Sequence, residues 1–140
     1  MRILGIDYGA ARVGVALGDT ETGIASPLLV LEERHREALC DRLVMLAKEE
    51  GITLIVVGIP HPLADQTRTT PQAQTIRDVM EALRERGIRV EEADETLSTQ
   101  LAQRQAKERG QGKKRDDLAA SVILQSWLDK RRYSEHGLSS

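Results

Sequence analysis

Short apolar runs separated by polar segments occupy the first third of the chain. Residues 2–9 (RILGIDYG) and 13–19 (VGVALGD) have the pattern of two strands, joined by a short basic turn around Ala11 and Arg12. Residues 27–32 (PLLVLE) form a third such run after the loop TETGIAS. Because the links between the runs are short, the pattern predicts an antiparallel meander.

The spacing then becomes helical. Residues 32–50 contain apolar positions three and four apart, which predicts a helix that ends at Gly51: these are Leu39, Leu43, Leu46 and Ala47. The continuous apolar run at 52–60 (ITLIVVGIP) is typical of a strand that is covered on both faces.

The second half predicts helix–strand–helix–helix. Thr70-Pro71 is a favourable helix start and Gly87 a favourable end, and the strand IRVEEA follows at 88–93. One helix is expected from Ser98 to about Arg109. A last helix, apolar on most sides, is expected over DDLAASVILQSWLDK from Asp116.

This order predicts an α/β fold with one mixed five-stranded sheet, in which two parallel strands extend a three-stranded antiparallel meander and helices cover both faces. Strands four and five are expected to run parallel to strand one. No linker or repeat divides residues 1–133, which we take as a single domain followed by a polar C-terminal tail at 134–140.

Composition narrows the class of protein. Aromatic residues make up 2% of the chain and Phe is absent, which argues against nucleic-acid binding by aromatic stacking. The single cysteine, Cys40, excludes an internal disulfide and is expected to be a packed thiol. With no apolar stretch of membrane-spanning length and no signal-peptide pattern, we expect a cytoplasmic protein without a membrane partner.

The charge is unevenly distributed. Residues 1–100 contain 11 basic and 17 acidic side chains, whereas residues 101–133 contain 9 basic and 4 acidic ones. Six of the basic residues lie in RQAKERGQGKKR at 104–115. Such a block is either a solvated helix face and loop or a surface that follows a phosphate backbone.

Three acidic clusters fall where this topology would bring them together. Asp7 ends the predicted central strand, Asp94 and Glu95 end the last strand, and Asp116 and Asp117 open the last helix. Each also has a simpler interpretation as a turn or helix-cap residue. Carboxylates that share a pocket repel one another unless a cation binds them, and their hard oxygen ligands suit Mg²⁺ or Mn²⁺. Such a site beside a basic loop suits hydrolysis of a phosphodiester.

Four segments carry a family resemblance: IDYGAARVGVALGD, VVGIP, DETLST and DDLAASVILQSWL. In this order and spacing they resemble the YqgF/RuvX family of bacterial pre-16S rRNA nucleases, once treated as Holliday-junction resolvase-like proteins. The resemblance covers about residues 1–133. It implies an RNase H-like fold and a role in processing the 5′ end of precursor 16S rRNA.

Carried over position by position, the resemblance implies that Asp7, Glu95 and Asp116 are the catalytic carboxylates and the ligands of Mg²⁺ or Mn²⁺. It selects Asp116 rather than Asp117. The basic rim that would bind nucleic acid is formed by Arg12, Lys113, Lys114 and Arg115. Structured RNA or branched DNA is the expected partner, bound by a monomer or a homodimer.

Two departures from the family pattern affect the predicted grip on substrate. Thr96 stands where the family usually has Arg, and the segment HPLADQTRTT at 61–70 replaces a glycine-containing loop.

Three other functions share parts of this pattern. A DNA junction resolvase would use the same chemistry but requires two active sites related by a two-fold axis. A non-catalytic RNA-binding assembly factor would use the basic loop alone. An actin-like ATPase is suggested by GIDYG, but such enzymes close two domains over the nucleotide and this chain supplies one.

Overall fold

The computed structural model describes residues 1–9, 12–33, 35–59, 71–94 and 116–138. The strands are β1 (Arg2–Tyr8), β2 (Val13–Asp19), β3 (Ile24–Leu31), β4 (Ile52–Ile59) and β5 (Val90–Asp94). The helices are α1 (Arg36–Glu50), α2 (Pro71–Glu85) and α4 (Asp116–Leu138). The helix expected at 98–109 lies outside the described residues, and α4 includes residues 134–138 of the segment we took as a polar tail.

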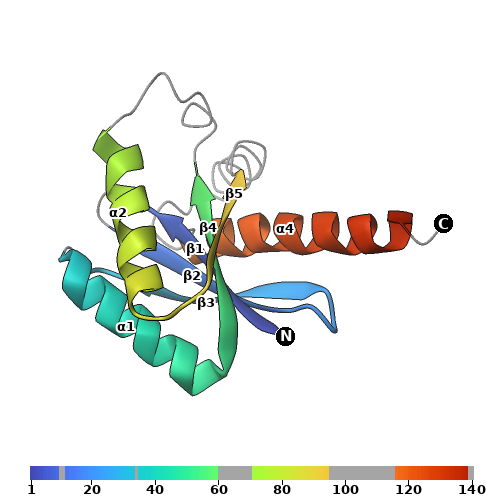
Figure 1. The fold of residues 1–140 in the computed structure, drawn as a ribbon, viewed down its shortest axis with the longest axis horizontal. Helices are drawn as coiled ribbons and strands as arrows, with labels where there is room; N and C mark the ends of the chain where they lie inside the picture. Colours follow the sequence, from blue (N-terminus) through green and yellow to red (C-terminus); the bar gives the residue numbers. More distant parts are fainter. Residues whose placement is uncertain (10–11, 34, 60–70, 95–115, 139–140) are drawn as a thin grey trace.

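The five strands form one sheet in the order β3-β2-β1-β4-β5. β1 pairs antiparallel with β2 and parallel with β4, and β5 runs parallel to β4. The predicted mixed sheet, with β1 at its centre, is therefore confirmed (Figure 1).

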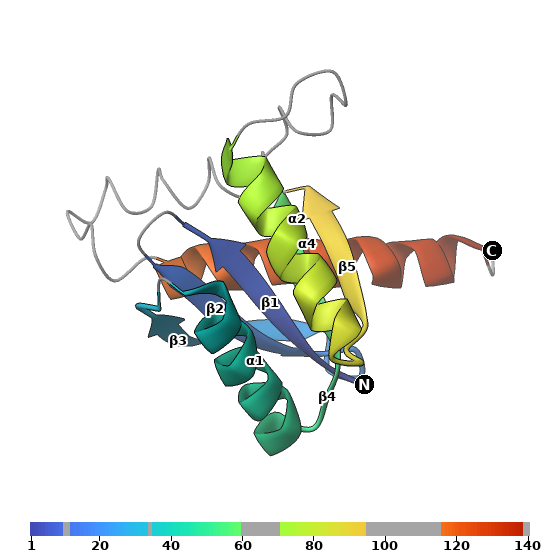
Figure 2. The ribbon, with the colours of Figure 1, turned by 60° about the vertical axis from the view of Figure 1, so that its left-hand side comes forward.

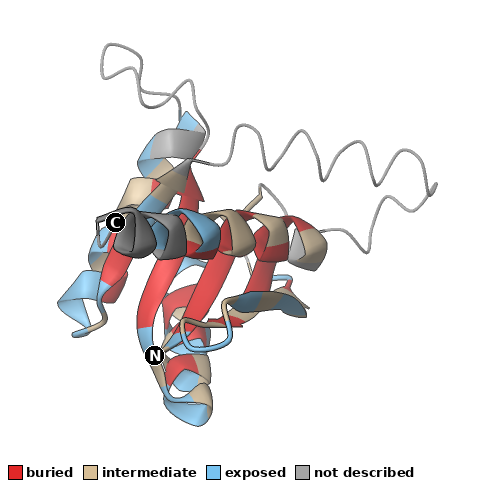
Figure 3. Cartoon of the chain, turned by 90° about the vertical axis from the view of Figure 1, so that its right-hand side faces the viewer, coloured by how far each residue is buried: buried red, intermediate tan, exposed pale blue. Residues whose placement is uncertain are grey.

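Helices cover both faces of the sheet, as predicted. On one face α1 and α2 bury the larger apolar cluster, which includes Leu4, Ile6, Leu43, Val57 and Met80. On the other face α4 lies across the strands and buries a smaller cluster, whose fully or nearly buried members are Ile3, Ala16, Leu54, Val56, Ala120, Leu124 and Leu128 (Figure 3). β4 contributes to both clusters, which explains its continuous apolar run.

Local signals account for the helix boundaries. Gly51 adopts a left-handed conformation (φ 65°, ψ 41°) and donates its N–H to the carbonyl of Ala47, which closes α1 where the sequence predicted. The helix begins at Arg36 rather than at residue 32, because His35 has an extended backbone and its N–H bonds to the Glu33 carboxylate. Cys40 is fully buried on α1, and burial raises the pKa of its thiol, as expected for a packed residue.

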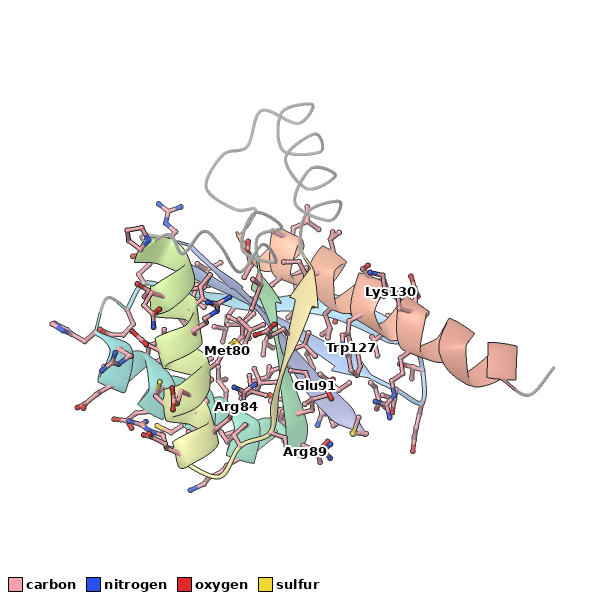
Figure 4. The ribbon with its side chains drawn as sticks, turned by 45° about the horizontal axis from the view of Figure 1, so that its top comes forward. Met80, Arg84, Arg89, Glu91, Trp127 and Lys130 are labelled. Carbon is pink, nitrogen blue, oxygen red and sulfur yellow. The ribbon has the colours of Figure 1, made fainter. Side chains whose placement is uncertain are left out.

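β5 forms one edge of the sheet, between α2 and α4. Figure 4 shows Met80 and Arg84 on the α2 side of this strand, with Trp127 and Lys130 on the α4 side. Within the described part of the chain, no helix is long and apolar enough to span a bilayer.

Candidate functional site

Asp7 lies one residue before the end of the central strand, on the face that α4 covers. Alternation along β1 places Ile3 and Gly5 on this same face, where Ile3 joins the apolar cluster under α4 and Gly5 contacts Leu124. Leu4 and Ile6 belong to the opposite cluster. Asp7 is half-buried and pairs across the ladder with Gly14. Asp7 therefore lies near the carboxyl end of the central strand, as predicted.

Helix α4 approaches this face closely because glycine lies beneath it. A β-carbon added to Gly5 would lie 2.7 Å from the Cβ of Leu124, and one added to Gly18 would lie 2.9 Å from its Cδ2. Gly18 also faces Leu128, with 3.1 Å between its added β-carbon and the Leu128 Cδ1. Because Gly18 pairs with Ile3 at the start of β1, α4 runs against the direction of β1.

The N-terminal turn of α4 consequently lies at the end of the sheet where β1 ends (Figure 2). Ala120, Leu124 and Leu128 follow one another at four-residue spacing and all belong to the cluster beneath the helix. Residue 116 is one turn before Ala120 in this row.

The last strand ends at the same end of the sheet as β1. β5 is parallel to β4, which is parallel to β1, so the carboxyl ends of all three strands point the same way. Asp94 is the last residue of β5 and pairs with Ile59 at the end of β4. The ends of β1 and β5 and the start of α4 therefore lie at the same end of the sheet, which is where the topology predicted the acidic clusters.

The turn between β1 and β2 adds a basic residue to this edge. Gly9 donates its N–H to the Arg12 carbonyl over 2.8 Å, and a β-carbon on Gly9 would lie 2.9 Å from that oxygen. Glycine at this position thus permits the tight approach that fixes the Arg12 backbone. Arg12 is followed by Val13, which pairs with Tyr8 at the end of β1.

Arg12 also has an acidic neighbour that the sequence did not indicate. Its Nε lies 3.6 Å from Oε1 of Glu32, the residue that follows β3. The hairpin register could have found this pair, because Val13 pairs with Leu31 and the next positions on the two strands are Arg12 and Glu32.

The structure does not describe the side chains of the other predicted site residues. Glu95, Lys113, Lys114 and Arg115 fall outside the described residues, and of Asp116 only the backbone is described. Among the side chains that are described, no group of three or more His, Cys, Asp or Glu residues gathers in a way that could hold a metal ion. The metal ligands inferred from the sequence therefore stay predictions.

Comparison with known proteins places the chain in a family. The model of the family described as "RuvX: Holliday junction resolvase" matches residues 1–130. A protein of Mycobacterium sp. (strain KMS) named "Putative pre-16S rRNA nuclease" is 43% identical over 139 residues, covering 94% of this chain and 81% of that protein. A protein of the same name in Mycolicibacterium paratuberculosis is 39% identical over 138 residues, covering 94% of this chain and 81% of that protein.

Solved structures of other nucleases share the fold. T. thermophilus RuvC in complex with a Holliday junction substrate superimposes with a TM-score of 0.60 at 16% identity, covering 94% of this chain and 96% of that chain. The Fowlpox virus resolvase bound to Holliday junction DNA gives 0.56 at 12% identity, covering 94% and 99%. At these identities the likeness establishes the fold alone, which is RNase H-like as the sequence resemblance implied.

Proposed function

Since the chain belongs to the RuvX family and is accordingly a nuclease, we propose that it uses a divalent metal ion to hydrolyse phosphodiester bonds in structured RNA. The proposed substrate is the 5′ end of precursor 16S rRNA, in ribosome maturation. The observation that supports this proposal most directly is the half-buried Asp7 at the carboxyl end of β1, on the face and at the edge where α4 begins. A turn-forming aspartate would not require β5 to end, and α4 to begin, with acidic residues at the same end of the sheet.

The proposed metal ligands are Asp7, Glu95 and Asp116. β4 alone separates β1 from β5, so the ends of these two strands are about two strand spacings, or roughly 10 Å, apart. Carboxylate side chains of different lengths can bridge such a gap to a shared ion. Ala93 on β5 packs against the cluster under α4, and we propose that Glu95, which follows β5 in the sequence, contributes its carboxylate to the same site.

The donor chemistry fits a hard cation. The proposed set contains carboxylate oxygens without His or Cys, which favours Mg²⁺ or Mn²⁺ over zinc. A divalent ion bound there would supply an activated water and charge stabilisation for phosphodiester hydrolysis. The protein's part is to hold the carboxylates on a rigid strand and a packed helix, with Gly5 and Gly18 keeping α4 close to the sheet.

Basic side chains at the rim would hold the substrate. Arg12 is described at this edge, and we propose that Lys113, Lys114 and Arg115, which immediately precede α4, act with it on backbone phosphates. Such contacts give affinity without sequence preference and weaken steeply with salt. RNA is the proposed substrate because the relatives of 43% and 39% identity are named for pre-16S rRNA.

Cleavage assays with an Asp7→Asn variant test this proposal. Purified protein would be incubated with a precursor 16S rRNA fragment, a linear DNA duplex and a four-way DNA junction, each with Mg²⁺, with Mn²⁺ or with EDTA. We expect metal-dependent cleavage of the RNA that is lost in Asp7→Asn. The control is Asp129→Asn, which makes the same change at an exposed position on the far part of α4.

A branched-DNA resolvase is the second candidate, favoured by the description of the matching family as Holliday junction resolvases. Preferential cutting of the four-way junction by a stable dimer would select it over the RNA nuclease. If RNA cleavage were unchanged in Asp7→Asn, the metal-site proposal would fail. Binding of RNA without cleavage under any metal would instead indicate the non-catalytic assembly factor.

A further inference from the structure

Glu32 and Arg12 form an opposite-charge pair at the edge of the sheet where β1 ends. Val13 at the start of β2 pairs with Leu31 at the end of β3, so Arg12 and Glu32 are the next positions outward on two antiparallel strands. The Arg12 Nε and the Glu32 Oε1 are 3.6 Å apart.

The two partners are unequally exposed. The Arg12 side chain is 28% exposed and its backbone is fixed through Gly9, whereas the Glu32 side chain is 75% exposed. An exposed ion pair of this length contributes little to folding stability, because water screens both charges. A backbone phosphate also matches the planar guanidinium better than a carboxylate held in this way, since it can accept two parallel hydrogen bonds.

We propose that Glu32 competes with the nucleic-acid backbone for Arg12 and so sets how readily this arginine binds a phosphate. This inference rests on the proposed function, which places substrate phosphates at the same edge. In the free protein the Glu32 carboxylate neutralises Arg12 and repels loosely bound phosphates. A phosphate that is held at the edge by other contacts displaces the carboxylate and pairs with Arg12. Glu32 is therefore a specificity-determining residue that lowers affinity for nucleic acid bound out of register.

Neutralising Glu32 isolates this competition. Binding of the full chain to a fluorescein-labelled RNA hairpin with a single-stranded 5′ extension would be measured by fluorescence anisotropy, in EDTA so that no cleavage occurs. Glu32→Gln should bind about two- to fivefold more tightly than the wild type, the range available to an exposed ion pair.

Glu33→Gln is the matched control. It removes the same charge one residue along the chain, but the Glu33 carboxylate accepts a hydrogen bond from the His35 N–H at 3.3 Å instead of facing Arg12. The gain in affinity should be clearly smaller than for Glu32→Gln. A second experiment compares Arg12→Gln with the double variant Arg12→Gln/Glu32→Gln. Here the gain in RNA affinity from Glu32→Gln should disappear, because the arginine for which Glu32 and the phosphate compete is absent.

Four results would overturn the inference. Equal gains in Glu32→Gln and Glu33→Gln, or a gain that persists without Arg12, would reveal a general effect of charge. Weaker binding by Glu32→Gln would mean that the carboxylate holds Arg12 ready for substrate instead of competing for it. Wild-type protein that binds neither this RNA nor a four-way DNA junction would leave no competition for Arg12 and would overturn the inference, whereas the cleavage assays with metal test the proposed function separately.

Discussion

Gly5 on β1 and Leu124 on α4 are in such close contact that a β-carbon on Gly5 would lie 2.7 Å from the Leu124 Cβ. This contact determines how near the first strand and the last helix can lie. Because Asp7 follows Gly5 on the same face and Asp116 opens the same helix, the contact also sets the spacing between two of the proposed metal ligands.

Gly5→Ala should therefore lower both stability and activity. The added methyl group forces α4 away from β1, and overpacking of this kind typically costs about 1–3 kcal/mol. Urea unfolding would measure the loss of stability, and cleavage of precursor rRNA per folded molecule the loss of activity. The control is Gly87→Ala, which meets no atom within 4 Å but is strained by a φ of +85°, at a cost of about 1 kcal/mol. It should lose stability and keep its activity. A Gly5→Ala protein as stable as the wild type would contradict the close contact.

Asp116 and Asp117 should respond differently to the same substitution. Both residues lie in the first turn of α4, where loss of one carboxylate weakens the interaction with the helix dipole by about 1 kcal/mol or less, so Asp116→Asn and Asp117→Asn should both preserve the helix. Residue 116 continues the row of Ala120, Leu124 and Leu128 toward the sheet edge. We expect Asp116→Asn to reduce cleavage by more than about a hundredfold, because even partners of metal ligands contribute tenfold or more. Asp117→Asn should stay close to wild type. The reverse ranking, measured in single-turnover assays with Mg²⁺, would reassign the ligand.

Asp19 should make stability depend on pH in the acid range. A hydrogen bond from the Glu21 backbone N–H, at 2.9 Å, lowers the pKa of Asp19, and the N-terminal ammonium 3.6 Å away lowers it further. A carboxyl whose pKa is lower in the folded state stabilises the protein above its unfolded pKa, about 4, and loses that contribution as the pH falls through the folded pKa.

Urea unfolding of the wild type and of Asp19→Asn, compared between pH 6 and pH 3, would measure this effect. The difference in unfolding free energy should be largest at pH 6 and narrow as the pH falls. Glu21→Gln, which keeps the backbone donor, should reproduce the wild-type profile. A gap that widens toward pH 3 would show that the sign is wrong.

Arg84 should stabilise β5, the strand at one lateral edge of the sheet. The Ile55 N–H of β4 donates a hydrogen bond to the Arg89 carbonyl. The next carbonyl along the chain, that of Val90 in β5, therefore points away from β4. It accepts a hydrogen bond from the Arg84 guanidinium at 3.1 Å. Arg84→Ala should therefore destabilise the protein by about 1 kcal/mol. Arg89→Ala removes the same charge from a neighbouring exposed position and should cost less in thermal or urea unfolding. Equal losses would attribute the effect to charge alone.

Much of this fold follows from periodicity. The two-residue period of ILGIDYG places Asp7 on the Gly5 face, the continuous run 52–60 identifies a strand that is buried on both sides, and Gly51 ends α1 as expected. These features are local, or depend only on which face of an element is apolar, so the sequence contains them.

Other features depend on contacts between distant segments. Nothing local marks Gly5 as the point where a helix more than a hundred residues later touches the sheet. The charged residues around 32–36 give no signal for where α1 starts, because its start depends on the extended backbone of His35. The pairing of Glu32 with Arg12 requires the register of the β2–β3 hairpin, which the pattern of apolar residues did not supply.

The docking of α4 on β1 has a consequence for when activity arises during synthesis. All five strands precede α4 in the chain, and the edge proposed for catalysis needs both β1 and the start of that helix. A nascent chain can thus pair its strands before it can assemble the carboxylates. A chain whose site needs the start of α4 would then stay inactive until that helix had emerged from the ribosome.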